Sequence, residues 1–203
     1  MKDNAERQRA GRHVPAVMLF VMAVVVLVGA DLAAKTQAFA RVAPAAISLS
    51  GDWTGRPVIP PHEPVIVIPK VLALHLTANT GAVFGIGKGG RWVFVVFSVV
   101  AAAVILTIFA RSGARSWVLH LALAAVLAGA LGNLYDRLRF GVVRDMVLLF
   151  PGVKLPFGWR WPGGAEGLYP WIFNVADVCL VVGLLVLMIL MWREERTCRD
   201  AKP

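Results

Sequence analysis

The chain has 203 residues, of which 58% are hydrophobic and 16% are charged. Soluble domains average about a quarter charged residues, so this composition excludes an ordinary water-soluble protein and indicates a lipid environment. The formal net charge is +9, but the basic residues flank apolar runs and form no stripe interleaved with aromatic residues, which argues against nucleic-acid binding. Because no polar linker divides the chain, we expect one integral membrane domain over residues 1–203.

Four stretches are long and apolar enough to cross a bilayer, since a spanning helix needs about 20 mostly apolar residues. They are predicted at 14–34, 92–110, 116–134 and 171–192. The expected fold class is therefore membrane all-α, with four transmembrane helices. The first stretch follows a basic segment, as the apolar region of a cleaved signal peptide does, but it is longer than such a region usually is. We therefore expect it to be retained as a span.

The distribution of Lys and Arg predicts the orientation. These residues are densest in the short segments at the two ends of the chain and in the turn 111–115, and short basic segments stay in the cytoplasm. Both termini are therefore expected inside, and the longer segments 35–91 and 135–170 outside. Alternating aliphatic residues at 65–67 and 72–77 predict strands. We expect them to form a small β-containing platform on the outer, periplasmic face.

We expect neither a metal nor another cofactor. The two cysteines, Cys179 and Cys198, have no metal-ligand spacing and offer no disulfide framework. The four histidines are far apart in the sequence and show no ligand spacing. Chemistry is therefore expected from the ionisable side chains in and beside the apolar stretches, where a charge costs about 2.5–3.5 kcal/mol at a helix centre.

The polar residues near the first two spans have structural interpretations. Asp31 and Lys35 are four residues apart, which is one helical turn. They are expected to form an interfacial ion pair that holds the end of the first span. Asn79 is followed two residues later by Gly81, a pattern that suggests a tight turn presenting the Asn amide.

The third and fourth spans carry acids on the side predicted to lie outside. Asp145 follows the third span, and Asp177 lies three residues after Asn174 in the fourth. Because these spans are consecutive, the two carboxylates can meet and share one proton, so that one deprotonates water while the other protonates a scissile carbonyl. Intramembrane acids also serve proton relays and transporters, or simply satisfy neighbouring helices, and the residues leave these alternatives open. The gathering of the acids towards one face favours a catalytic site over a relay across the bilayer.

Four groups of residues, taken in chain order, resemble the motifs of the lipoprotein signal peptidases (signal peptidase II). The groups are Asp31 with Lys35; Asn79, Gly81, Ala82 and Phe84; Gly132, Asn133, Asp136, Arg137, Gly141, Val143 and Asp145; and Phe173, Asn174, Ala176 and Asp177. The resemblance covers all four spans, about residues 15–192. One such motif is a weak indication, whereas four in the right order and at the right membrane positions are specific.

The resemblance implies an aspartic endopeptidase of the bacterial inner membrane that removes signal peptides from diacylglyceryl-modified prolipoproteins, cleaving before the lipidated cysteine. By the same resemblance, Asp145 and Asp177 would be the catalytic dyad. The substrate-binding residues would be Asn79, Gly81, Asn133, Arg137 and Asn174. The structural supports would be Asp31, Lys35 and Asp136, the last beside Arg137 as its partner. The partners would be the prolipoproteins and membrane lipids, and the enzyme is expected to be a monomer.

The sequence departs from the family pattern near these residues. Leu32 stands where Gln is common, and Met146 stands where Phe is usual. Arg144 occupies a position that is commonly apolar. Because it directly precedes Asp145, its charge is expected to favour the ionised form of that carboxyl group. The stretch 36–61 is also longer than is typical.

Overall fold

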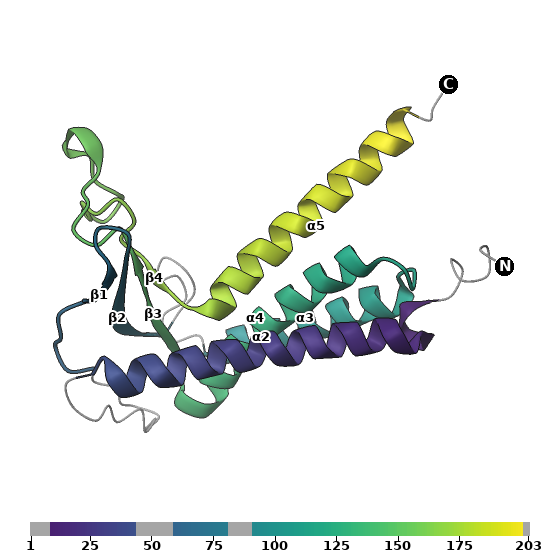
Figure 1. Ribbon diagram of the computed structural model, residues 1–203, viewed down its shortest axis with the longest axis horizontal. Coiled ribbons are helices and arrows are strands. Elements are labelled where there is room, and N and C mark those ends of the chain that lie inside the picture. The colour runs from purple at the N-terminus through teal and green to yellow at the C-terminus, as the bar shows by residue number, and fades with distance from the viewer. Residues whose placement is uncertain (1–8, 44–58, 81–90, 201–203) are drawn as a thin grey trace. The chain divides into compact units, whose positions relative to one another are not determined.

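Four long helices and a small antiparallel sheet make up the part of the chain that the structure, a computed structural model, describes: residues 9–43, 59–80 and 91–200 (Figure 1). The helices are α2 (Val14–Arg41), α3 (Arg91–Arg111), α4 (Trp117–Phe140) and α5 (Val175–Asp200). Each contains a stretch long and apolar enough to cross a membrane. Two short 3-10 helices are η1 (Ala10–Arg12) and η3 (Pro156–Gly158). The expected fold class is confirmed.

The helices are offset from the predicted spans. Helices α2, α4 and α5 continue past the ends of the predicted spans, so Asp31 and Lys35 lie inside α2 and not at its end. These two side chains are buried and paired with each other. Because pairing offsets the cost of burying a charge, the helix can continue past them. Helix α5 begins later than predicted because the two residues before Asn174 form a strand.

The sheet contains β1 (Val65–Ile68), β2 (Leu72–Asn79), β3 (Val143–Leu149) and β4 (Ile172–Phe173), side by side in that order and antiparallel (Figure 1). Strands β1 and β2 match the two predicted strands. Strand β3 was not predicted, because Arg144 and Asp145 interrupt its aliphatic pattern. In the β2–β3 pair, Thr77 lies opposite Asp145 and Asn79 lies opposite Val143. Pairing therefore brings Asn79 beside Asp145, far from it in sequence.

The chain divides into two compact units, each built from separate stretches. Unit 1 comprises Met1–Ala30, Val96–Gly132 and Val175–Pro203, and unit 2 comprises Asp31–Val95 and Asn133–Asn174. Unit 1 therefore contains most of the apolar helical residues. Unit 2 contains the whole sheet and the parts of α2 and α4 that carry the buried Asp31, Lys35 and Asp136.

Unit 1 has an apolar core formed by η1, α2, α3 and α4. Phe20 of α2 stacks on Phe109 of α3, with the ring centroids 4.1 Å apart, a distance at which aromatic rings attract one another. The buried members of the core are Ala10, Ala16, Phe20, Ile105, Phe109, Leu123, Ala124, Val126 and Leu127.

Glycines allow α4 and α5 to approach closely within unit 1. A Cβ atom on Gly183 would lie 2.6 Å from Val126 Cγ2 and 2.9 Å from Ala122 O. A Cβ atom on Gly129 would likewise lie 2.6 Å from Leu180 Cγ. Membrane helices associate through van der Waals packing, which small residues at the contact improve. These two glycines therefore fix how α5 lies against α4.

Candidate active site

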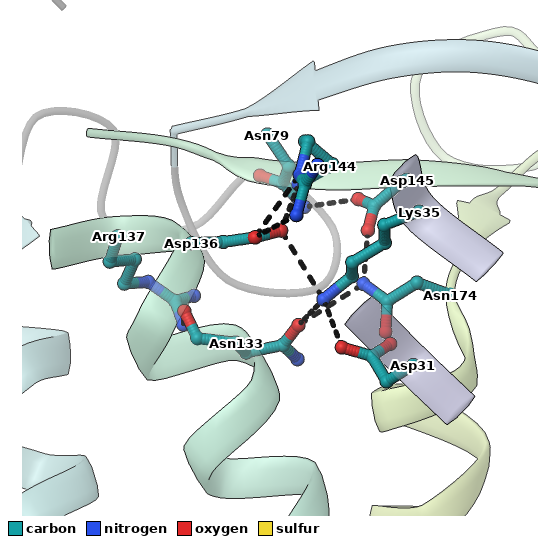
Figure 2. Close-up of polar contacts among 9 residues, drawn as sticks. All are labelled: Asp31, Lys35, Asn79, Asn133, Asp136, Arg137, Arg144, Asp145 and Asn174. Atoms are coloured by element: carbon teal, nitrogen blue, oxygen red, sulfur yellow. Dashed lines mark hydrogen bonds and ion pairs between the residues drawn. The ribbon is translucent and has the colours of Figure 1, made fainter. Parts of the chain in front are cut away.

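A group of charged and amide side chains lies together in unit 2 (Figure 2), and all of them except the half-buried Asn79 are buried. Helices α2 and α4 and strands β2 and β3 contribute to it, together with the residue that precedes α5. We call the following residues the polar cluster: Asp31, Lys35, Asn79, Asn133, Asp136, Arg144, Asp145 and Asn174. Burying a charge is costly unless the charge is paired and hydrogen-bonded. The contacts within the cluster are therefore what allow it to exist.

Lys35 of α2 is bound on three sides. Its Nζ atom lies 2.7 Å from Asp31 Oδ2 and 3.3 Å from Asp136 Oδ2, and it donates a hydrogen bond of 3.0 Å to Asn133 Oδ1 (Figure 2). An ammonium group has three N–H donors, so each has an acceptor within reach. The predicted pair of Asp31 with Lys35 is present. The pair is also buried, since the two side chains are 1% and 0% exposed.

Asp136 of α4 binds Arg144 of β3 through both its side chain and its backbone. Asp136 Oδ1 accepts hydrogen bonds from Arg144 Nε at 3.1 Å and Nη2 at 2.8 Å. Asp136 Oδ2 accepts one from the Arg144 backbone N–H at 3.0 Å. The guanidinium group also lies 4.5 Å from the ring centroid of Phe140, within cation–π range. It is therefore held by a carboxylate on one side and an aromatic ring on another.

This arrangement changes two expectations drawn from neighbouring positions in the sequence. Arg144 was expected to act on Asp145, but its guanidinium binds Asp136. Asp136 was expected to pair with the adjacent Arg137, but it binds Arg144 and Lys35. Successive side chains on a strand point to opposite faces, so adjacent residues of β3 meet different partners. This alternation along a strand was the sequence signal that could have indicated different partners for Arg144 and Asp145.

Asp145 receives amide donors on both carboxylate oxygens. Asn174 Nδ2 donates to Asp145 Oδ1 at 2.5 Å, and Asn79 Nδ2 donates to Asp145 Oδ2 at 3.3 Å (Figure 2). The same Asn174 nitrogen donates to Asn133 Oδ1 at 3.2 Å. Asp145 is 2% exposed. The carboxylate is thus fixed in direction, as a group in acid–base chemistry must be.

The cluster is nearly balanced in charge. It contains three carboxylates (Asp31, Asp136 and Asp145) and two cations (Lys35 and Arg144). The two cations lie against Asp31 and Asp136. Asp145 is held instead by neutral amide groups. Hydrogen bonds to a charged carboxylate stabilise it without removing its charge.

The remaining predicted site residues lie in other surroundings. Arg137 Nη1 donates to the backbone oxygen of Asn133 at 3.4 Å, and its guanidinium carbon lies 4.9 Å from the Phe94 ring centroid. Gly81 lies outside the described residues. Asp177 is in the first turn of α5, which belongs to unit 1. The pairing of Asp145 with Asp177 and the substrate-binding roles therefore stay predictions.

Unit 2 also has a cavity of about 660 Å³ beside β2, with His62 and His75 in its lining. His62 Nε2 accepts a hydrogen bond of 2.9 Å from the Leu76 backbone N–H, and its ring centroid lies 4.9 Å from that of His75. The pKa of His75 is below its ordinary value. Burial is the main cause and the nearby His62 the second, with Glu63 acting in the opposite direction.

Comparison with known proteins gives consistent matches. The model of the family described as signal peptidase (SPase) II matches residues 22–193. A lipoprotein signal peptidase of Pseudomonas syringae pv. tomato is 37% identical over 140 residues, covering 67% of this chain and 73% of that protein. One of Symbiobacterium thermophilum is 36% identical over 135 residues, covering 66% of this chain and 80% of that protein. A solved bacterial membrane enzyme has the same fold, with a TM-score of 0.65 at 21% identity, over 91% of this chain and 93% of the other.

Proposed function

The chain belongs to the signal peptidase II family, and we propose that it removes signal peptides from diacylglyceryl-modified prolipoproteins by cleaving before the lipidated cysteine. The observation that carries this proposal is the match of the family over residues 22–193, which include all the predicted site residues. The polar cluster by itself suits either a peptidase or a proton relay, because both need buried acids. Family membership favours the peptidase.

The chemistry we propose is that of an aspartic peptidase with Asp145 and Asp177 as its dyad. One carboxylate removes a proton from a water molecule while the water oxygen bonds to the scissile carbonyl carbon. The other, protonated carboxyl group gives its proton to the carbonyl oxygen. The C–N bond of the intermediate then breaks, as the carboxyl group that took the water's proton gives a proton to the leaving amine and the other carboxylate takes back the proton of a hydroxyl group. The fixed direction of the buried Asp145 supports its place in this mechanism.

The substrate contacts follow from the same proposal. Asn79, Asn133 and Asn174 lie around Asp145, so their amide groups would meet the substrate backbone at the scissile bond. Arg137 and Gly81 would complete this surface. The site would open at the outer face of the bacterial inner membrane, with both termini in the cytoplasm, and the enzyme would act as a monomer among membrane lipids.

The test uses purified full-length protein and two peptides of one prolipoprotein sequence, with and without diacylglyceryl on the cysteine. We expect cleavage of the lipidated peptide alone, with the lipidated cysteine as the new N-terminus by mass spectrometry. The Asp145→Asn protein serves as the inactive control. Equal rates on the two peptides would remove the lipoprotein assignment, and cleavage of neither by folded protein would remove the peptidase assignment.

A further inference from the structure

We propose that Lys35 is a positioning residue for Asp145: acting through Asn133 and Asn174, it makes Asp145 the member of the dyad that accepts the proton from water. This inference rests on the proposed function, because it assigns roles within that dyad. The hydrogen bond from Lys35 to Asn133 is not needed to pair the charge of Lys35. Only two of the three contacts of the Lys35 ammonium are to carboxylates, and the third is to the Asn133 amide.

Lys35 fixes the direction of the Asn133 amide. The two ends of an Asn amide have nearly the same shape, so packing alone does not choose between them. A lysine ammonium can donate hydrogen bonds but cannot accept them. The atom of Asn133 that lies 3.0 Å from Lys35 Nζ must therefore be the oxygen. Lys35 is 0% exposed, so no water competes for this contact.

The direction of the Asn174 amide follows from that of the Asn133 amide. Asn133 Oδ1, fixed by Lys35, accepts a second hydrogen bond of 3.2 Å from Asn174 Nδ2. An oxygen can be met only by the donor end of Asn174, so this contact orients that amide as well. Its NH₂ group carries two hydrogens, and the other is available to Asp145 Oδ1. Lys35 thus fixes the orientation of both amides, so that Asn174 presents a donor to the Asp145 carboxylate (Figure 2).

The protonation of Asp145 follows from its two amide donors. Asn174 donates to one of its oxygens and Asn79 donates to the other. Two donors stabilise the ionised carboxylate more than the neutral acid, which needs an acceptor for its own proton. The proton shared by the dyad therefore resides on Asp177. Asp145 then removes the proton of the water, and Asp177 gives its proton to the carbonyl oxygen.

The other charged groups of the cluster do not provide this effect. Arg144 is bound to Asp136 through its side chain, and Asp31 and Asp136 together face Lys35. These charged groups come from α2, α4 and β3, whereas β2 and the residue before α5 contribute the neutral amides of Asn79 and Asn174. Their charges offset one another, so the amide donors decide which form of Asp145 is favoured.

The test is the charge-balanced variant Asp31→Asn/Lys35→Met, which removes the donor to Asn133 and leaves the net charge unchanged. We expect kcat per folded molecule to fall by about tenfold or more, a part of the 10²–10⁴ that acid–base catalysis supplies, with KM within about twofold. The acid limb of the pH–kcat profile should move to higher pH. Infrared difference spectra against Asp145→Asn in each background should show the Asp145 carboxyl keeping its proton to higher pH.

The matched control is Lys154→Met/Glu166→Gln, the same kind of substitution in an exposed ion pair of unit 2. It should leave kcat, its pH profile and the infrared titration as in the wild type. If the first variant does not fold, Asn133→Ala tests the same link, because it removes the oxygen and leaves the ion pairs of Lys35 in place. Its Asp145 band should shift in the same direction.

An unchanged pH profile and an unchanged Asp145 band in the folded Asp31→Asn/Lys35→Met protein would overturn the inference. So would an unchanged band in Asn133→Ala where that variant replaces it. The infrared titration does not depend on turnover. Wild-type protein that fails to cleave the lipidated peptide would therefore remove the proposed function, while the band of Asp145 would still decide whether Lys35 sets its protonation.

Discussion

Asp136 holds Arg144 by its backbone N–H at 3.0 Å and by its guanidinium group at 2.8 Å. One carboxylate of α4 thus fixes both the position and the direction of a residue near the start of β3. The next residue of that strand is Asp145, so the contact also limits where Asp145 can lie. Support for the proposed catalytic residue comes from the residue beside it.

We predict that removing this carboxylate destabilises the protein. Asp136→Asn leaves Arg144 and Lys35 buried with one carboxylate fewer, and breaking a buried ion pair costs about 3–5 kcal/mol. The thermal unfolding midpoint should fall. Adding Arg144→Met should recover part of the loss, because it removes the surplus cation. A double variant no more stable than Asp136→Asn would show that the pair contributes little.

The proposed dyad predicts that neither aspartate can be replaced by its amide. Asn is nearly isosteric with Asp but cannot act as a base, so Asp145→Asn and Asp177→Asn should each abolish cleavage while the protein still inserts and folds. The double variant should be no worse than either single one, because residues that act as a unit are not additive. Turnover per folded molecule is the measurement. Substantial turnover by Asp177→Asn would refute the two-aspartate mechanism.

The close contact of α4 with α5 predicts a strong dependence on Gly183. Gly183→Ala places a Cβ atom 2.6 Å from Val126 Cγ2, and overpacking of this kind costs about 1–3 kcal/mol. Gly29→Ala is the control, since a Cβ atom there meets nothing within 4 Å. Thermal unfolding should separate the two variants, with Gly183→Ala the less stable. Equal midpoints would contradict the prediction, because they would mean that the added Cβ atom at position 183 does not lower stability.

The lowered pKa of His75 predicts a dependence of stability on pH. The unfolded chain binds a proton on this residue below about pH 6.5, whereas the folded protein does so only at lower pH. The contribution of His75 to the free energy of unfolding should therefore be constant above that value and decrease as the pH falls towards the folded pKa. Unfolding midpoints of wild type and His75→Gln, measured from about pH 7.5 to about pH 5, should diverge on the acid side. Parallel curves would contradict the prediction.

The distribution of Lys and Arg predicts that both termini are cytoplasmic. Reporter domains fused at Pro203 and within 51–56 should therefore lie in opposite compartments. A phosphatase that is active only outside and a fluorescent protein that is active only inside provide complementary signals. The same compartment for both fusions would contradict the orientation on which the outer-face site depends.

The sequence by itself determined the four spans, two of the strands and the set of candidate acids. Apolar runs of about 20 residues can satisfy their backbone in lipid only as helices. Alternation of aliphatic residues indicated β1 and β2, because a strand with one covered face shows this pattern within a few residues. Most residues of the polar cluster could also be identified as candidates from the sequence. An ionisable group in an apolar segment is costly, and such groups in membrane proteins are usually functional.

The tertiary structure decided which partner each of these residues has. Neighbours in sequence suggested Arg137 for Asp136 and Asp145 for Arg144, whereas the actual pair is Asp136 with Arg144. Lys35 proved to contact Asn133, 98 positions away in the sequence. Such choices depend on the rotation of each helix about its axis and on the register of β2 against β3. Both are set by packing between distant segments, so no local pattern of residues contains them.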